Sequence, residues 1–164
     1  MSTLTVWKFN SADGAEKVLD KLQSLQKQEI IKVMDAAIVF WPEGRKKPKT
    51  YQAVNTVGVG ALGGAFWGML FGLIFLVPLF GMIVGATTGA LSGKFTDYGI
   101  NDEFIKEVRG KVTEGTSALF LLTGPVTVDK VKDAFAPEER GELVQSNLTA
   151  EQEAKLKEDF GADL

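Results

Sequence analysis

The chain has 164 residues, a net charge of −3 at pH 7, and neither cysteine nor histidine. This length supports one domain, or one small domain with an insertion. Without cysteine there are no disulfides and no thiolate metal sites, and without histidine the commonest general base and metal ligand is missing. The acidic balance, with no basic run interleaved with aromatic residues, argues against nucleic acid as a partner. We therefore expect a non-enzymatic protein with no cofactor, no metal site and no identified small-molecule substrate.

The N-terminal part predicts a strand followed by a helix. Residues 4–9 are rich in β-favouring types. From Ala15 to Leu25 apolar residues then recur at three- and four-residue steps, which is typical of an amphipathic helix. Asp13 and Glu16 have the spacing of a capping box at its start. Because the segment MSTLTVWKFN shows no secretory signal, we expect the chain to begin in the cytoplasm.

Residues 30–41 predict a second strand, which Asp35 interrupts. Two explanations of Asp35 remain open: an edge or bulge position, which we favour, and a buried carboxylate with a shifted pKa. Pro-Glu-Gly at residues 42–44 predicts a turn, and a short return strand is expected through residues 49–52.

No charged residue lies between Lys49 and Lys94, although charged residues make up 24% of the chain. We call residues 50–93 the uncharged segment. It predicts a pair of tightly packed helices, with a first arm at 54–77 that is long enough to span a membrane and a shorter second arm at 79–93. The turn at Val77, Pro78 and Leu79 lies within the apolar sequence FLVPLFGMI, so we expect it to stay buried in lipid or protein.

Glycines recur at four-residue steps in both arms of this hairpin. Such stripes let helix backbones approach closely, and close packing would offset a cost of about 1 kcal/mol for each glycine in a helix. The predicted packing positions are Gly60, Gly64, Gly68 and Gly72 in the first arm and Gly81, Gly85, Gly89 and Gly93 in the second. A G-x-G-x-x-G match at residues 58–63 carries little weight, because no acidic residue follows at the spacing that a dinucleotide site requires.

Basic residues flank the uncharged segment on both sides. They predict contact with anionic lipid headgroups, and the positive-inside rule then places both termini in the cytoplasm. A solvated turn explains the first cluster equally well. The residues are Arg45, Lys46, Lys47 and Lys49 before the segment and Lys94 after it.

Four further elements are expected after the uncharged segment: a short helix at 104–108, a strongly buried strand at 117–123, a helix at 128–135 and a strand at 142–148. A charged C-terminal helix would follow. Its capping box is Thr149 with Gln152, and its apolar contacts are Leu156 and Phe160.

Strand–helix–strand thus occurs twice, which is the pattern of a ferredoxin-like split βαβ domain of the α+β class. The apolar, glycine-rich helical hairpin would be inserted between the second and third core strands. The expected division is 1–49 for the first half, 50–95 for the hairpin, 96–148 for the second half and 149–164 for the charged helix. This pattern predicts an architecture and no activity.

Three stretches together resemble a bacterial membrane-protein family that is defined by a domain of unknown function, numbered twelve-sixty-nine. They are VWKFNSADGAEKVLDKL near the N-terminus, GALGGAFWGMLFGLIFLVPLFGMIVGATTGALSG in the uncharged segment, and TDYGINDEFIKEV with SALFLLT after it. The resemblance covers most of the chain up to about Thr123. It implies a membrane-associated protein with a glycine-zipper-like hairpin and no established reaction.

Two functions remain open from the sequence. The first is a self-associating structural or scaffolding protein of the bacterial inner (cytoplasmic) membrane, with the hairpin in the bilayer and the α/β domain in the cytoplasm. The alternative is a water-soluble homo-oligomeric shell or ring in the cytoplasm, whose hairpins share a dry interior. A pore is disfavoured, because no charged residue lies along the hairpin.

Overall fold

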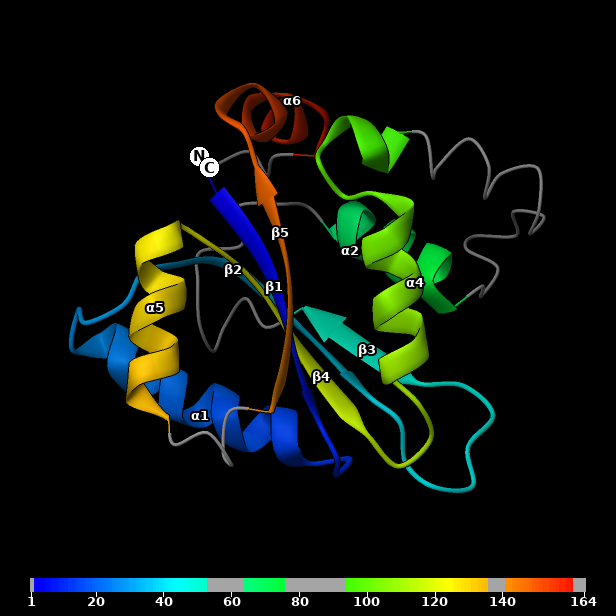
Figure 1. Ribbon diagram of the computed structural model, residues 1–164. Coiled ribbons are helices and arrows are strands. Elements are labelled where there is room, and N and C mark those ends of the chain that lie inside the picture. Colours follow the sequence, from blue (N-terminus) through cyan, green and yellow to red (C-terminus); the bar gives the residue numbers. More distant parts are fainter. Residues whose placement is uncertain (1, 53–63, 76–93, 136–140, 161–164) are drawn as a thin grey trace.

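The computed structural model describes residues 2–52, 64–75, 94–135 and 141–160 (Figure 1). Its centre is a five-stranded antiparallel sheet with the strand order β3-β2-β4-β1-β5. The strands are β1 (Ser2–Phe9), β2 (Val33–Phe40), β3 (Lys49–Gln52), β4 (Ser117–Thr123) and β5 (Glu142–Leu148). The labelled helices are α1 (Gly14–Lys27), α2 (Gly64–Phe75), α4 (Asp102–Lys111), α5 (Pro125–Ala134) and α6 (Ala150–Phe160). The prediction of a fold that combines helices with a sheet is confirmed.

Strand β4 is the centre of the sheet. All seven of its residues are buried, as the apolar run SALFLLT predicts. Phe120 lies opposite Val6 of β1 on one side and Ala37 of β2 on the other. Because side chains alternate between the two faces of a strand, β4 supplies core residues to both faces.

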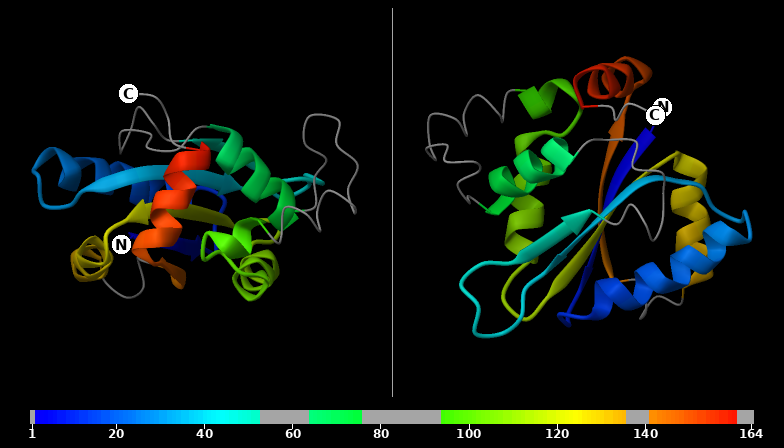
Figure 2. Two further views of the ribbon diagram at one scale, coloured as in Figure 1. Left: turned by 90° about the horizontal axis from the view of Figure 1, so that it is seen from above. Right: turned by 180° about the vertical axis from the view of Figure 1, so that it is seen from behind.

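Helices α1 and α5 cover one face of the sheet, on the opposite side from α2 and α4 (Figures 1 and 2). Leu19 and Leu22 of α1 and Val128 and Val131 of α5 pack in one cluster with Trp7 and neighbouring sheet residues. This is the arrangement that the amphipathic patterns of both helices predict, with apolar residues inward and charged residues outward.

Helices α2, α4 and α6 belong to the core on the other face. Phe66, Leu70 and Ile74 of α2 pack there with sheet residues such as Val6 and Phe120. The amphipathic α4 adds Phe104, Ile105 and Val108, and α6 adds Leu156. The described part of the uncharged segment therefore packs on the sheet of its own chain, which the sequence did not predict. The predicted domain boundary at residue 50 falls within β3, which pairs with β2.

Of the two predicted capping boxes, the one at α6 is present and the one at α1 is not. The capping box of α6 is confirmed: the Thr149 N–H donates to Gln152 Oε1 at 2.9 Å, and the Gln152 N–H donates to Thr149 Oγ1 at 3.2 Å. The predicted capping box of α1 is wrong, because the Asp13 side chain makes no capping hydrogen bond. Asp13 instead pairs with Lys17 at 3.2 Å, and this partner lowers the pKa of the Asp13 carboxyl.

Asp35 lies at an irregularity of β2, where the pairing with β4 shifts between Val33 and Asp35. The predicted bulge is therefore present. The side chain is also fully buried, and its Oδ1 accepts a hydrogen bond from the Ala36 N–H at 2.8 Å. The irregularity agrees with the bulge position that we favoured, and the buried carboxylate makes a local structural contact.

Candidate functional site

Helix α2 sits on the centre of the sheet through an aromatic cluster. Phe71 meets Phe120 of β4 edge to face, with ring centroids 5.0 Å apart, and Trp67 meets the same ring at 6.3 Å. Trp67 and Phe71 stack on each other at 5.9 Å. Edge-to-face and stacked pairs of this kind add about 0.5–1.5 kcal/mol each to the burial of the rings. α2 is therefore part of the folded core.

The outer side of α2 carries part of the predicted glycine stripe. Gly68 is partly exposed, and a Cβ added to it would have none of the described atoms within 4 Å. Gly64 begins the helix and Gly72 is buried within it. The other predicted packing and turn positions lie outside the described residues: Gly60, Gly81, Gly85, Gly89, Gly93, Val77, Pro78 and Leu79. None of the described helices combines the length and the apolar character that crossing a membrane requires.

Arg109 fixes the C-terminal end of α2. Its Nε donates to the Ile74 carbonyl at 2.6 Å, and its Nη2 donates to the Leu73 carbonyl at 2.8 Å. These carbonyls lie in the last turn of the described helix, where the helix dipole favours a cation. Sequence reasoning missed this residue. The sequence does give one indication that Arg109 faces the core: it follows the buried Ile105 by four residues and so lies on the same face of α4.

Trp41 connects the same end of α2 to the basic turn between β2 and β3. Its ring meets Phe75 of α2 at right angles, with centroids 6.4 Å apart. Its Nε1 donates to the Arg45 carbonyl at 2.8 Å. Trp41 therefore links the backbone of this turn, at Arg45, to the end of the uncharged helix. The basic residues of the turn are all exposed; they are Arg45, Lys46, Lys47 and Lys49.

Lys94 lies at a different place from the basic turn. Its Nζ is 5.3 Å from the ring centroid of Phe160 in α6. The basic turn lies at the end of the sheet away from α6. It follows Trp41, whose carbonyl accepts a hydrogen bond at 2.6 Å from the Gly115 N–H, just before β4. Figure 1 shows the β2–β3 turn and α6 at opposite ends of the domain. The structure thus brings four of the five predicted headgroup contacts together.

An aromatic group under α6 joins the start of α2 to the region after the uncharged segment. Phe160 contacts Phe66 of α2 at 5.7 Å and stacks on Phe95 at 6.5 Å. Tyr98 is fully buried, and its hydroxyl donates to Asp159. Burial first, and the Asp159 carboxylate second, raise the pKa of the Tyr98 phenol. Of this group, only Phe160 was predicted as a contact.

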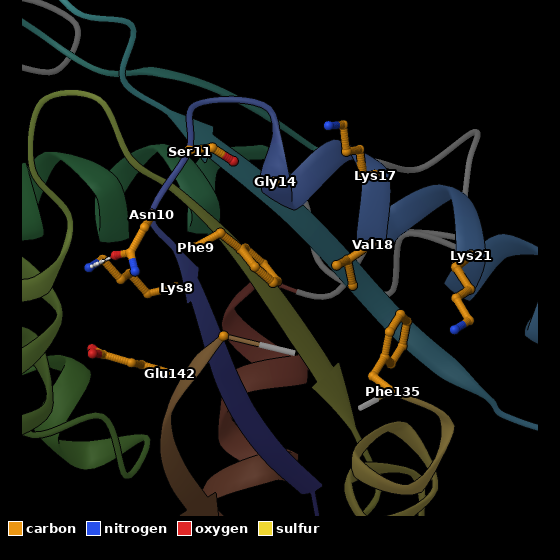
Figure 3. A pocket seen from close by; sticks show the side chains of 11 residues that line it. Lys8, Phe9, Asn10, Ser11, Gly14, Lys17, Val18, Lys21, Phe135 and Glu142 are labelled. Carbon is orange, nitrogen blue, oxygen red and sulfur yellow. Dashed lines mark hydrogen bonds between the residues drawn. The ribbon is translucent and has the colours of Figure 1, made fainter. Parts of the chain in front are cut away.

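A cavity of about 690 Å³ lies on the other face, at the start of α1 (Figure 3). Phe9, Val18 and Phe135 form its apolar wall, and the Lys21 ammonium lies 4.5 Å from the centroid of the Phe135 ring. Gly141 also lines it; with φ at +70° and a would-be Cβ 2.2 Å from the Lys8 carbonyl oxygen, this position requires glycine. The requirement comes from chain packing and not from a ligand.

The charges around this cavity are matched by protein partners. Glu142 pairs with Lys111 at 3.0 Å, which lowers the pKa of the Glu142 carboxyl, and Lys17 pairs with Asp13. The Lys8 ammonium donates to the Asn10 side chain at 2.7 Å. No group of three or more acidic side chains in the described ranges could hold a metal ion. Three lysines, Lys8, Lys17 and Lys21, line the cavity, and each of them contacts a side chain of its own chain.

The arrangement defines an α/β domain with an uncharged helix docked on one face of its sheet. The family described as "Protein of unknown function (DUF1269)" matches residues 61–161, and the chain belongs to this family. The matched span starts in the uncharged segment and includes every described element from α2 to α6. No curated protein and no solved structure matches the chain.

Proposed function

We propose that this protein is a non-enzymatic, self-associating, membrane-associated protein of structural or scaffolding type, with its α/β domain at the cytoplasmic face. One observation carries the proposal: the uncharged helix α2 uses one side for its own sheet and leaves Gly68, on another side, facing open space among the described atoms. Helices that are apolar all round belong inside a protein or inside a membrane. A second surface is therefore needed to cover α2.

The fold gives this helix its position. We infer a ferredoxin-like split βαβ domain, because β5-β1-β4-β2 is the strand order of that fold once β3 is set aside, and α1 and α5 both lie on one face. In this interpretation the other face is left open by the two βαβ units. The insertion between β2 and β4 supplies α2 to that face.

The basic turn favours a membrane over a soluble shell as the surroundings of α2. Arg45, Lys46, Lys47 and Lys49 are exposed, and Trp41 links their turn to Phe75 at the end of α2. A basic cluster beside an apolar helix, with a tryptophan between them, suits a surface of anionic lipids, where each cation contributes about 1 kcal/mol.

Cell fractionation without detergent tests the membrane part of the proposal. We expect the full-length protein to sediment with membranes and to resist an alkaline wash. Replacing Arg45, Lys46, Lys47 and Lys49 by glutamine should shift it toward the supernatant. Recovery of the wild-type protein as large uniform particles in the supernatant would refute membrane association and favour the soluble shell.

A matched pair of glycine substitutions tests the role of the outer side of α2. Gly68→Leu and Gly110→Leu both fall within helices at positions where an added Cβ meets nothing within 4 Å among the described atoms. Both should leave folding intact, because leucine has the higher helix propensity. Only Gly68→Leu should change the size of the assembly, measured by sedimentation in mild detergent. Equal behaviour of the two variants would contradict self-association through α2.

A further inference from the structure

The two edges of the sheet differ in how they are protected from pairing with other strands. Unpaired edges invite association, and proteins guard them with short strands, lysine, proline or bulges. β3 has only four residues, starts with Lys49 and follows Pro48 and a basic run. β5 has seven residues, contains neither lysine nor proline, and pairs with β1 in one continuous register. Among the described residues, the β5 edge lacks these guards, and its one loop contact lies toward its C-terminal end, where the Ser146 hydroxyl donates to the Gly99 carbonyl.

The side chains of β5 leave its outer edge neutral. Val144 and Leu148 point into the core, whereas Gln145 and Asn147 are exposed. The only charged residue is Glu142 at one end, which pairs with Lys111 of its own chain at 3.0 Å. Figure 1 shows β5 at the front of the sheet between α5 and α4, and in the described sheet its sole neighbour is β1.

We propose that β5 is a docking edge for a second copy of this chain, paired antiparallel with β5 of that copy about a two-fold axis at Gln145. Gln145 is the middle residue of the strand, so this register overlaps all seven residues. It also sets Val144 opposite Ser146 of the second copy, and directly opposed residues lie on the same face of a sheet. The core face of one sheet therefore continues into the core face of the other.

The difference between the edges favours a closed pair over a fibre. Pairing of β5 with β3 of the next copy would be heterologous and could continue without end, whereas pairing of β5 with itself closes after two copies. The guarded β3 edge opposes the first arrangement. This inference rests on the proposed function for the identity of the partner, but it uses a different surface from α2.

Crosslinking in the full-length protein tests the pairing directly, because the chain has no cysteine of its own. Gln145→Cys should give a covalent dimer in high yield with a short bismaleimide. Val126→Cys is the matched control, since Val126 is 66% exposed on α5 and lies off the proposed edge. Equal dimer yields from the two variants, or no dimer from Gln145→Cys, would overturn the proposal.

Charge substitutions at the axis give a second, independent readout. Gln145→Lys and Gln145→Glu should each weaken dimerisation about two- to fivefold, because each places like charges opposite one another. An equimolar mixture of the two should restore a heterodimer, detected by native mass spectrometry. Unchanged dimerisation of both variants would contradict the proposed register.

The outcomes separate this inference from the proposed function. If Gly68→Leu alters the assembly but Gln145→Cys gives no dimer, the self-association through α2 stands and the β5 pairing is wrong. If Gln145→Cys crosslinks while Gly68→Leu behaves like Gly110→Leu, the β5 pairing stands and the role of α2 is wrong.

Discussion

The two faces of the sheet are covered in different ways. α1 and α5 are amphipathic helices that place leucines and valines inward and charged side chains in water. α2, on the opposite face, contains no charged residue and buries Phe66, Trp67 and Leu70 against the sheet. The first face therefore needs no cover beyond its own helices. Among the described residues, the second leaves Gly68 of an apolar helix partly exposed, which is why we propose the association surface there.

The comparison shows what a hydrophobic pattern can and cannot specify. A periodic pattern has a direction, so it indicates both a helix and the side that faces the core. An unbroken apolar run indicates burial but gives no direction, and it fits a lipid bilayer, an oligomer interior and the chain's own sheet equally well. The described part of α2 is buried on the sheet of its own chain, and another side of the helix is left open among the described residues.

The largest expected effect comes from a pair of core truncations, one on each face. Leu22 of α1 and Leu70 of α2 are both fully buried. Leu22→Ala and Leu70→Ala should each lower the free energy of unfolding by about 2–5 kcal/mol, from lost burial and the cavity left behind. Denaturant unfolding followed by circular dichroism measures both. A normal loss for Leu22→Ala with none for Leu70→Ala would show that α2 is not part of the folded core.

A smaller effect is expected at the end of α2. Arg109→Met removes two hydrogen bonds to the carbonyls of Leu73 and Ile74 and should cost about 1–2 kcal/mol of unfolding free energy. Arg109→Lys should cost less, because lysine keeps the charge and loses the planar fork. Lys106→Met, at an exposed site on the same helix, is the control and should stay within about 0.5 kcal/mol of wild type. Equal stability of Arg109→Met and the control would show that the two hydrogen bonds from Arg109 do not stabilise the fold.

The starts of α4 and α1, on opposite faces of the sheet, differ in their capping hydrogen bonds. The Asn101 side chain accepts a hydrogen bond from the Phe104 N–H at 2.9 Å at the start of α4, whereas Asp13 makes no such bond at the start of α1. Asn101→Ala should therefore cost about 1 kcal/mol in thermal or denaturant unfolding. Asp13→Ala should cost less. The reverse order would mean that these starts are capped differently from the structure.

The dependence of stability on alkaline pH involves the two tyrosines of the chain, Tyr51 beside α1 and Tyr98 beside α6. Burial, followed by Glu16, raises the pKa of Tyr51 to about 12, and burial with Asp159 raises the pKa of Tyr98. A folded-state pKa above the unfolded value of about 10 adds stability below pH 10, which is lost as pH rises through the folded value. Ultraviolet titration should therefore show no phenolate step near pH 10. Tyr98→Phe should leave only the Tyr51 step and flatten the alkaline loss of stability. A step near pH 10 that disappears in Tyr98→Phe would contradict the buried hydrogen bond.

Much of the fold follows from local patterns in the sequence. SALFLLT predicts the buried β4, Thr149 and Gln152 predict the cap of α6, and the three- and four-residue steps from Ala15 predict α1. The predicted cap at Asp13 failed because its backbone is helical (φ −102°, ψ −2°) and not extended as at a capping residue, and its carboxylate pairs with Lys17 instead. Spacing alone does not show which partner a carboxylate takes.

The candidate site was less predictable, because its contacts join residues far apart in the chain. Arg109 binds carbonyls of Leu73 and Ile74, and a backbone carbonyl leaves no trace in the sequence. The Trp41–Phe75 contact likewise depends on the register of β2 and the placement of α2 on the sheet. The basic turn was identified from composition, but its position beside the end of α2 required the fold.

Hydrogen exchange of the full-length protein, followed by mass spectrometry, tests the central claim most directly. We predict that amides of residues 66–74 in α2 exchange as slowly as those of residues 15–26 in α1, because both helices are part of one folded core. Faster exchange of the α2 amides in the Leu70→Ala variant would further support docking of α2 on the sheet. Fast exchange in α2 beside a protected α1 would show that the uncharged helix is not docked on the sheet, and the account of this face would then fail.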